Sequence, residues 1–161
     1  MALNDYFLKV DDIPGESHDD KHKDEIELES WGWRSEQQGG SAVGGGGGVG
    51  KVRMQDLWVK MKTNKATAKL GLACWNGKPI PKVVLTCRKA GEEQQEFCKL
   101  TLTNALVSSH SISGKEGDTH PADECSFNFE QIEVEYSPQK EDGKLDSPVT
   151  AGWNVKTNKK V

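Results

Sequence analysis

Three segments of this sequence change the phase of their hydrophobic alternation midway. Residues 24–33 place apolar side chains first at even positions and then, as tryptophans, at odd positions. Residues 52–61 make the same change, and residues 127–136 change from odd to even positions. Because successive side chains of a strand point to opposite faces, each change requires a bend or a bulge. Three such strands predict a strongly curved antiparallel sheet rather than a flat one.

The rest of the chain predicts further strands and one helix. Strands are expected at residues 6–10 and 149–156, and a hairpin is expected to join residues 83–88 to 96–102. Between residues 64 and 76 apolar side chains recur at helical spacing, before an Asn-Gly stop signal. The inventory is seven or eight strands and one short α-helix near residues 64–76. We therefore expect a mainly β fold, an antiparallel barrel or sandwich with the helix closing one side.

The composition limits the core that this chain can build. It has 161 residues, of which 34% are hydrophobic, and a net charge of −4. This length fits one domain, which we expect to span residues 1–161. The low apolar fraction predicts a thin core, with part of the surface shared with other copies. Acidic and basic residues are interspersed, so no basic patch predicts nucleic-acid binding.

The sequence contains no signal for a membrane span or a cleaved leader. No apolar stretch approaches ~20 residues, and the first ten residues lack the basic and apolar regions of a signal peptide. We therefore expect no membrane insertion, folding in the cytosol and, for any export, a route without a cleaved signal peptide. The cysteines form no CxxC pair, and a reducing cytosol favours free thiols. Cys87 and Cys98 could still face each other across the hairpin, so a disulfide between them after export stays an alternative.

Eight of the 17 glycines lie between residues 39 and 50. Gly45 to Lys51 matches the start of a phosphate-binding loop, in which backbone N–H groups and the lysine hold phosphates. That loop continues with Ser or Thr and opens a helix. Here Val52 follows, and residues 52–61 predict a strand. A flexible surface loop is the favoured interpretation, and a small nucleotide-binding protein using the Gly45–Lys51 loop is the alternative.

The histidines and acidic residues do not predict a metal or catalytic centre. Residues 18–25 combine two histidines with several carboxylates, but lysines interleave with them and no further ligand cluster follows at a usable spacing. We interpret this segment as a solvated turn that leads into the second strand. His110 and His120 have no nucleophile motif beside them. We therefore expect no enzyme activity, no catalytic residue, no metal site and no cofactor.

Five tryptophans stand out in a chain with few other aromatic residues: Trp31, Trp33, Trp58, Trp75 and Trp153. In a thin core each can bury ~150–250 Å² of surface. Tryptophan is also enriched at the anchor points of subunit contacts. The sequence leaves both roles open for each of them.

Motifs spread over the whole chain occur in an order that resembles one known family. They are Asp11-Asp12-Ile13-Pro14-Gly15-Glu16-Ser17, the run from His22 to Glu25-Ile26, Ser30-Trp31-Gly32-Trp33, Gly50-Lys51-Val52 after the glycine tract, Gln55-Asp56-Leu57, Arg88-Lys89-Ala90-Gly91, Leu106-Val107-Ser108-Ser109, Phe127 to Tyr136, Pro138-Gln139-Lys140, Asp142-Gly143 and Gly152-Trp153-Asn154. Together they resemble the haemolysin-coregulated protein (Hcp) family, the tube proteins of the bacterial type VI secretion system.

The resemblance implies a small antiparallel β-barrel with one helix and a role in assembly. In this family six copies form a ring with a wide channel, and rings stack into a tube inside a contractile sheath, capped by a VgrG-type spike protein. Sheath contraction ejects the tube together with small effectors that the channel carries and chaperones. By resemblance, the chain is a homohexamer in the bacterial cytoplasm before firing. Afterwards it is secreted or enters a target cell, as a virulence factor.

The resemblance also assigns one contact loop. The family's long loop between the second and third strands reaches toward a neighbouring ring. Here this inter-ring loop corresponds to Gln37, Gln38, Gly39, Gly40, Ser41, Ala42, Val43, Gly44, Gly45, Gly46, Gly47, Gly48, Val49 and Gly50. The family often begins its helix with a Ser-Pro element, whereas this chain has Ala66-Thr67-Ala68, so the helix start is expected to differ. A monomeric β-sandwich adaptor is a third hypothesis, and no residue is assigned to the channel lining.

Overall fold

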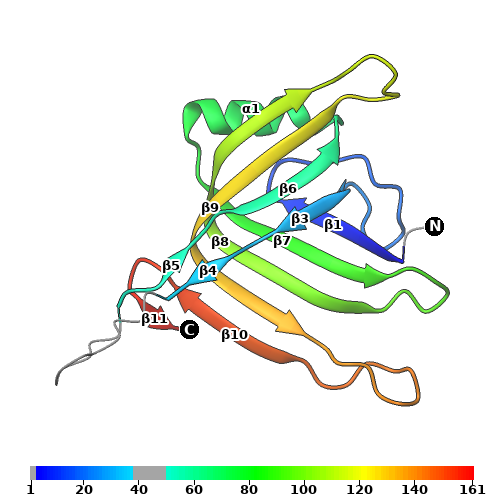
Figure 1. Ribbon diagram of the computed structural model, residues 1–161, viewed down its shortest axis with the longest axis vertical. Helices are drawn as coiled ribbons and strands as arrows, with labels where there is room; N and C mark the ends of the chain where they lie inside the picture. The colour runs from blue at the N-terminus through cyan, green and yellow to red at the C-terminus, as the bar shows by residue number, and fades with distance from the viewer. Residues whose placement is uncertain (1–2, 38–49) are drawn as a thin grey trace.

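The computed structural model describes residues 3–37 and 50–161, which form curved strands and one helix (Figure 1). In chain order the elements are β1 (Asn4–Val10), β2 (Ile26–Glu27), β3 (Ser30–Gly32), β4 (Ser35–Glu36), β5 (Arg53–Met54), β6 (Leu57–Lys62), α1 (Thr67–Asn76), β7 (Ile80–Lys89), β8 (Glu96–Ser113), β9 (Ala122–Tyr136), β10 (Val149–Asn154) and β11 (Lys159–Lys160). None of the helices in these two ranges is long and apolar enough to cross a membrane.

All paired strands are antiparallel, and the main sheet has the order β11-β10-β9-β8-β7-β1-β2. The long strand β9 pairs with β8 on one side. On its other side, its first half pairs with β6 and its second half with β10. The strand β6 in turn pairs with β3. The sheet therefore branches at β9, and its two arms share the β8–β9 hairpin.

The strand ladder does not close into a complete barrel, because β2 and β3 do not pair with each other. The two residues between them make the link instead. The backbone N–H of Leu28 donates to the carbonyl of Tyr6 on β1, and that of Glu29 donates to Lys60 on β6. The predicted mainly β, antiparallel, barrel-like fold with one helix is confirmed, with its circuit completed through this short segment.

The structure resolves the three predicted phase changes in two ways. Residues 24–33 become β2 and β3, separated at Leu28 and Glu29, and residues 52–61 become β5 and β6, separated at Gln55 and Asp56. Residues 127–136 stay within one continuous strand, β9, whose buried side chains change phase between Phe129 and Ile132. A bulge between Val107 and Ser109 bends the partner strand β8. Curvature therefore arises where the sequence pattern predicts it.

The core fills the inside of the curved sheet and is closed on one side by α1, which contacts β8 (Figure 1). Its fully buried apolar side chains come from β1, β2, β6, α1, β7, β8 and β9: Leu8, Ile26, Leu57, Val59, Met61, Leu70, Val83, Leu85, Leu102, Val107 and Phe127. Each such side chain contributes about 1.5–3 kcal/mol relative to exposure. Burial on this scale fixes the strand register, since a shift by one residue would expose the whole set.

The helix begins three residues later than predicted, at Thr67 instead of residue 64. Asn64 forms a turn before it: its side-chain oxygen accepts the N–H of Ala66, and its own N–H donates to the hydroxyl of Thr67. These bonds use the side chain to build a non-helical turn. The helix ends as predicted at Asn76, because Gly77 adopts the left-handed conformation with φ 63°.

Other strand boundaries also differ from the prediction. The hairpin of β7 and β8 is confirmed, and both strands are longer than residues 83–88 and 96–102. The final strand β10 is confirmed within residues 149–156, and the chain then turns back as β11, which was not predicted. Two lysines give β11 no hydrophobic pattern, so nothing in its composition marks it as a strand.

Candidate functional site

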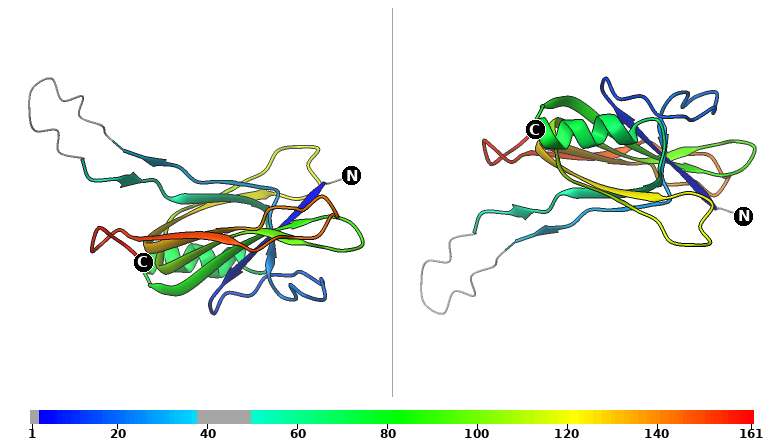
Figure 2. Two further views of the ribbon diagram at one scale, coloured as in Figure 1. Left: turned by 90° about the horizontal axis from the view of Figure 1, so that it is seen from below. Right: turned by 90° about the horizontal axis from the view of Figure 1, so that it is seen from above.

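The strands β4 and β5 form a separate two-stranded ribbon that stands away from the main sheet (Figure 2). Ser35 pairs with Met54 and Glu36 with Arg53. The ribbon is continuous with β3 and β6, and the N–H of Gln55 donates to the carbonyl of Arg34 at its base. The phase changes therefore direct two strands, β4 and β5, out of the barrel as a separate ribbon.

The far end of this ribbon leads to the two described ends of the predicted inter-ring loop. Of its residues, Gln37 and Gly50 are described, and residues 38–49 lie outside the described part of the chain. Two residues beyond Lys51 the chain enters a strand, β5. A phosphate-binding loop needs a helix at that point. The nucleotide-binding alternative therefore has no support.

A largely apolar groove of about 660 Å³ opens where the ribbon meets β9 and β10. Its walls include Trp33, Val52, Met54, Ile132, Val134 and Trp153, and Gln37 and Gly50 reach its rim. The indole N–H of Trp153 is buried and has no hydrogen-bond partner within residues 3–37 and 50–161. Trp33 and Trp153 were expected either to fill the core or to anchor subunit contacts, and their convergence here depends on the pairing of β10 with β9.

The five tryptophans divide between the two roles left open by the sequence. Trp31 and Trp33 pack against the core, and Trp153 is half-buried. Trp58 is 46% exposed and Trp75 is 78% exposed. Trp58 lies against the bare backbone of Gly32, where a Cβ would approach the indole to 2.5 Å. Two tryptophans are therefore available for contacts outside the chain.

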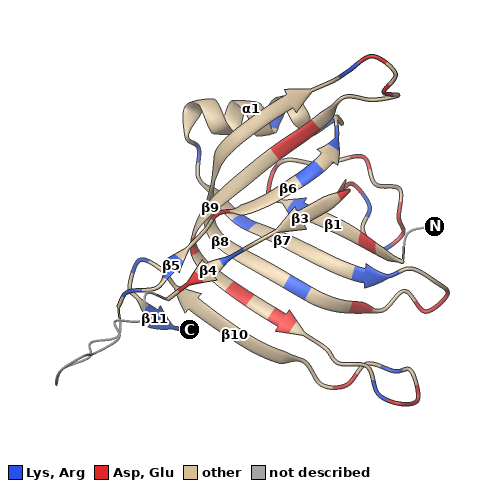
Figure 3. Cartoon of the chain, in the orientation of Figure 1, with Lys and Arg blue, Asp and Glu red and all other residues tan. Residues whose placement is uncertain are grey.

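The helix α1 carries an exposed apolar face. Leu72 is 52% exposed, and it lies on the same helix as Trp75. The helix has no acidic residue in its first turn and no basic residue in its last turn. Lys69 is its one charged residue, and the other charged residues are scattered over the strands and the loops (Figure 3). An apolar helix surface of this kind is typical of an interaction site rather than of a monomer's solvent face.

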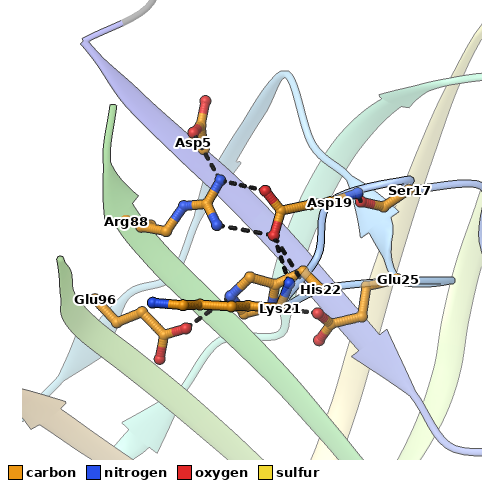
Figure 4. Close-up of polar contacts among 8 residues, drawn as sticks. All are labelled: Asp5, Ser17, Asp19, Lys21, His22, Glu25, Arg88 and Glu96. Carbon is orange, nitrogen blue, oxygen red and sulfur yellow. Dashed lines mark hydrogen bonds and ion pairs between the residues drawn. The ribbon is translucent and has the colours of Figure 1, made fainter. Parts of the chain in front are cut away.

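A buried ionic network holds the loop of residues 11–25 against the barrel (Figure 4). The guanidinium of Arg88 donates to both carboxylate oxygens of Asp19, at 2.9 and 2.7 Å, and to Asp5 at 3.2 Å. The bond from Arg88 is the main cause that lowers the pKa of Asp19 to about 2, and backbone N–H groups of Lys21 and His22 add to it. The same pair raises the pKa of Arg88.

His22 extends the network and corrects one sequence interpretation. Its ring stacks on Phe7 at 4.3 Å, its Nδ1 bonds to Glu25, and its Nε2 lies 2.7 Å from Glu96. The guanidinium carbon of Arg88 also lies over the Phe7 ring, 4.8 Å from its centre. The expectation of a solvated turn at residues 18–25 is confirmed for its exposed residues, His18, Asp20, Lys21, Lys23 and Asp24. It is wrong for Asp19, His22 and Glu25, whose side chains are used in packing. Sequence reasoning missed this, since the partners lie on distant strands.

A second polar cluster lies under the start of α1. Asp123 is fully buried and accepts hydrogen bonds from the hydroxyls of Thr63, at 2.7 Å, and Thr67, at 2.6 Å. His110 Nε2 lies 3.4 Å from the same carboxylate. His120, which the sequence analysis considered together with His110, lines a surface pocket near Lys62. Within the described residues, no group of His, Cys, Asp and Glu side chains is arranged to hold a metal ion.

Comparisons with known proteins agree with this geometry. Residues 7–136 match the family model described as type VI secretion system effector, Hcp. The chain is 44% identical over 160 residues to Protein hcp1 of Pseudomonas aeruginosa, covering 98% of both chains.

Solved structures give the same result. One described as a type six secretion system protein superposes with a TM-score of 0.92 at 31% identity, covering 98% of this chain and 99% of the other. Hcp1 from Salmonella typhimurium superposes with a TM-score of 0.83 at 35% identity, covering 99% and 100%. This chain belongs to the Hcp family, the tube proteins of the type VI secretion system.

Proposed function

We propose that six copies of this chain form a ring, that the rings stack into a tube, and that contraction of a surrounding sheath ejects the tube. Small effector proteins travel in the channel. The observation that carries this proposal is similarity over the whole chain, 44% identity across 160 residues to Protein hcp1. A structural role also agrees with the use of the histidines and carboxylates in packing, and we propose no enzyme activity.

Exposed apolar surface supports assembly. The strongly exposed Trp75 and Leu72 on α1, together with Val149 on the edge strand pair β10–β11, would be unfavourable on a permanent monomer. The strand order also ends in β2 and β11, and the edge of a sheet can pair with a strand of a partner. Symmetric association would cover such surface repeatedly around a closed ring.

Residues 37–50 are proposed as the contact to the next ring. The support is positional, because the β4–β5 ribbon directs the chain away from the barrel at this point (Figure 2). The apolar groove at the base of the ribbon, with the unpaired indole N–H of Trp153 among residues 3–37 and 50–161, offers a place for an incoming segment. In this proposal residues 1–161 form one domain.

The remaining parts of the proposal follow from the family. The partners are a VgrG-type spike protein, the contractile sheath and small effectors, with no nucleic acid and no membrane insertion. The protein stays in the bacterial cytoplasm until firing and then leaves the cell or enters a target cell.

Light scattering tests ring formation. We expect purified protein to show a mass near six times 17.7 kDa. A persistent monomer at high protein concentration would overturn the proposal.

Shortening the glycine tract separates ring formation from stacking. Deletion of residues 44–48 should leave hexamers intact in light scattering and abolish tubes in electron micrographs. Loss of hexamers together with tubes would contradict the inter-ring assignment, whereas it would leave the ring proposal in place.

A further inference from the structure

Two cysteines face each other directly across the β7–β8 hairpin. Cys87 and Cys98 are register partners, and both are free thiols. Directly opposed residues of an antiparallel pair have Cα atoms about 4.5–5.5 Å apart. Disulfides span Cα separations of about 4.4–6.8 Å. The backbone of this hairpin therefore already has the separation that a cross-strand disulfide needs.

The two side chains lie on the same face of the sheet. Cys87 continues the buried row of Val83 and Leu85, and Cys98 precedes the buried row of Leu100 and Leu102. Because side chains alternate along a strand, both thiols point toward the core side at the turn end of the hairpin. Cys87 is buried, whereas Cys98 is half-buried, so a reagent from solvent can reach Cys98 first.

The thiols are also chemically unequal. The hydrogen bond from Cys87 is the main cause that lowers the pKa of Cys98 to about 7, with help from the backbone N–H of Lys99 and against burial and the charge of Glu135. The same bond and burial raise the pKa of Cys87. Since the thiolate is the nucleophile in disulfide exchange, Cys98 is the attacking group.

We propose that Cys87 and Cys98 are an oxidative modification site, in which a disulfide oxidant such as oxidised glutathione converts the facing thiols into a cross-strand disulfide. The Cys98 thiolate attacks one sulfur of the oxidant and releases the first molecule of reduced thiol. The Cys87 sulfur then attacks the Cys98 sulfur, and the proton of Cys87 passes to the departing thiolate, which leaves as the second molecule of reduced thiol. Two cysteine thiols are oxidised by two electrons, and one oxidant disulfide is reduced to two thiols.

The new bond would lock the end of the hairpin that anchors the loop of residues 11–25. Arg88, which holds Asp19, follows Cys87 directly. Glu96, which holds His22, lies two residues before Cys98. The register shifts between Cys87 and Arg88, so this rung is the last regular one before the anchors. The disulfide therefore fixes the distance between the backbones of Arg88 and Glu96, and its reduction lets that distance vary again.

Peptide mapping of the intact purified protein tests the proposal. After treatment with oxidised glutathione and digestion with trypsin, we expect the peptides of residues 83–88 and 90–99 to be joined, with the loss of two hydrogen atoms. The midpoint of thermal unfolding should rise by about 5 °C, and a reductant should reverse the change. Cys98→Ser should abolish both effects. Cys74→Ser, a matched change at another half-buried thiol, should keep both.

Three outcomes would overturn the inference. They are alkylation of Cys98 after oxidation, a lasting mixed disulfide between Cys98 and glutathione, and a bond from Cys98 to Cys74 or to another chain. The measurement uses the wild-type protein, so it does not depend on whether a Cys87 variant folds. It is also independent of ring assembly, since the bond forms within one hairpin.

Discussion

Two buried charged residues of this protein are neutralised in different ways. Arg88 on β7 is 2% exposed, and two carboxylates, Asp19 and Asp5, match its charge. Asp123 on β9 is fully buried, and its hydrogen-bond donors are mainly the neutral hydroxyls of Thr63 and Thr67. One site therefore pairs opposite charges, whereas the other surrounds a charge with hydroxyl groups.

The difference follows from what each residue has to hold. Asp19 belongs to a long loop, and it lies 69 positions from Arg88 in the sequence. Thr67 belongs to α1, which Leu70 and Ala66 already attach to the core through full burial. Apolar side chains already attach α1 to the core, so its buried carboxylate needs only hydrogen-bond donors. The loop of residues 11–25 has little apolar surface, so an ion pair is needed to attach it. Removing one partner of a buried pair is correspondingly costly.

The largest effect should come from Asp19→Ala. Arg88 would keep only Asp5, whose side chain is 38% exposed, so its buried charge would be poorly compensated. We expect the free energy of unfolding to fall by about 3 kcal/mol, measured by urea denaturation. Asp20→Ala is the matched control, because Asp20 is adjacent and exposed, and it should change stability by at most about 0.5 kcal/mol. Equal losses in the two variants would contradict the anchoring role.

The pH dependence should sharpen this result. The pKa of Asp19 is lowered to about 2 in the folded protein, against an unfolded value of about 3.9. Its contribution is therefore complete above about pH 4 and is lost as the pH falls toward 2. We expect the wild type to lose about 2 kcal/mol more than Asp19→Ala over this range, by urea denaturation at each pH. Parallel curves for the two proteins would rule this out.

The curved sheet could be predicted from the sequence because its cause is local. Residues 24–33 and 52–61 change the phase of their alternation where the structure separates β2 from β3 and β5 from β6. A face change within a few residues leaves the backbone no other solution than a bend. The unpredicted strand β11 has no such local pattern, since its two lysines pair with β10 only through the turn that precedes them.

The anchoring network could not be predicted in the same way. His22 and Asp19 lie in a polar stretch whose composition predicts a solvated segment. Glu96 lies 74 positions from His22, and Arg88 lies 69 positions from Asp19. Asp5, the second partner of Arg88, lies 83 positions from it. Only the pairing of β1 with β7 and of β7 with β8 brings these residues to one place. Ion pairs between distant segments depend on topology, and a single sequence contains no local signal of them.

Amide substitutions test whether charge matters equally at the two sites. Asp19→Asn removes the charge that Arg88 requires, so we expect a loss of about 2 kcal/mol. Asp123→Asn keeps an oxygen for one threonine hydroxyl, and its amide can donate to the other, so the loss should be about 1.5 kcal/mol or less. Urea denaturation measures both. A larger loss for Asp123→Asn would reverse the comparison and assign the stricter charge requirement to the helix site.

The smallest effect should come from Thr63→Val, which replaces one hydroxyl donor of Asp123 with a methyl group of similar size. Asp123 keeps the bond from Thr67, so the free energy of unfolding should fall by about 1 kcal/mol. Thr63→Ser keeps the hydroxyl and is the matched control. Hydrogen exchange at the start of α1 should accelerate in the valine variant, whereas exchange in the loop of residues 11–25 should not change. The N–H of Lys65, just before α1, donates to Glu16 of the loop at 2.8 Å. Acceleration in both regions would therefore mean that the two buried charges are coupled, through this hydrogen bond or through the sheet.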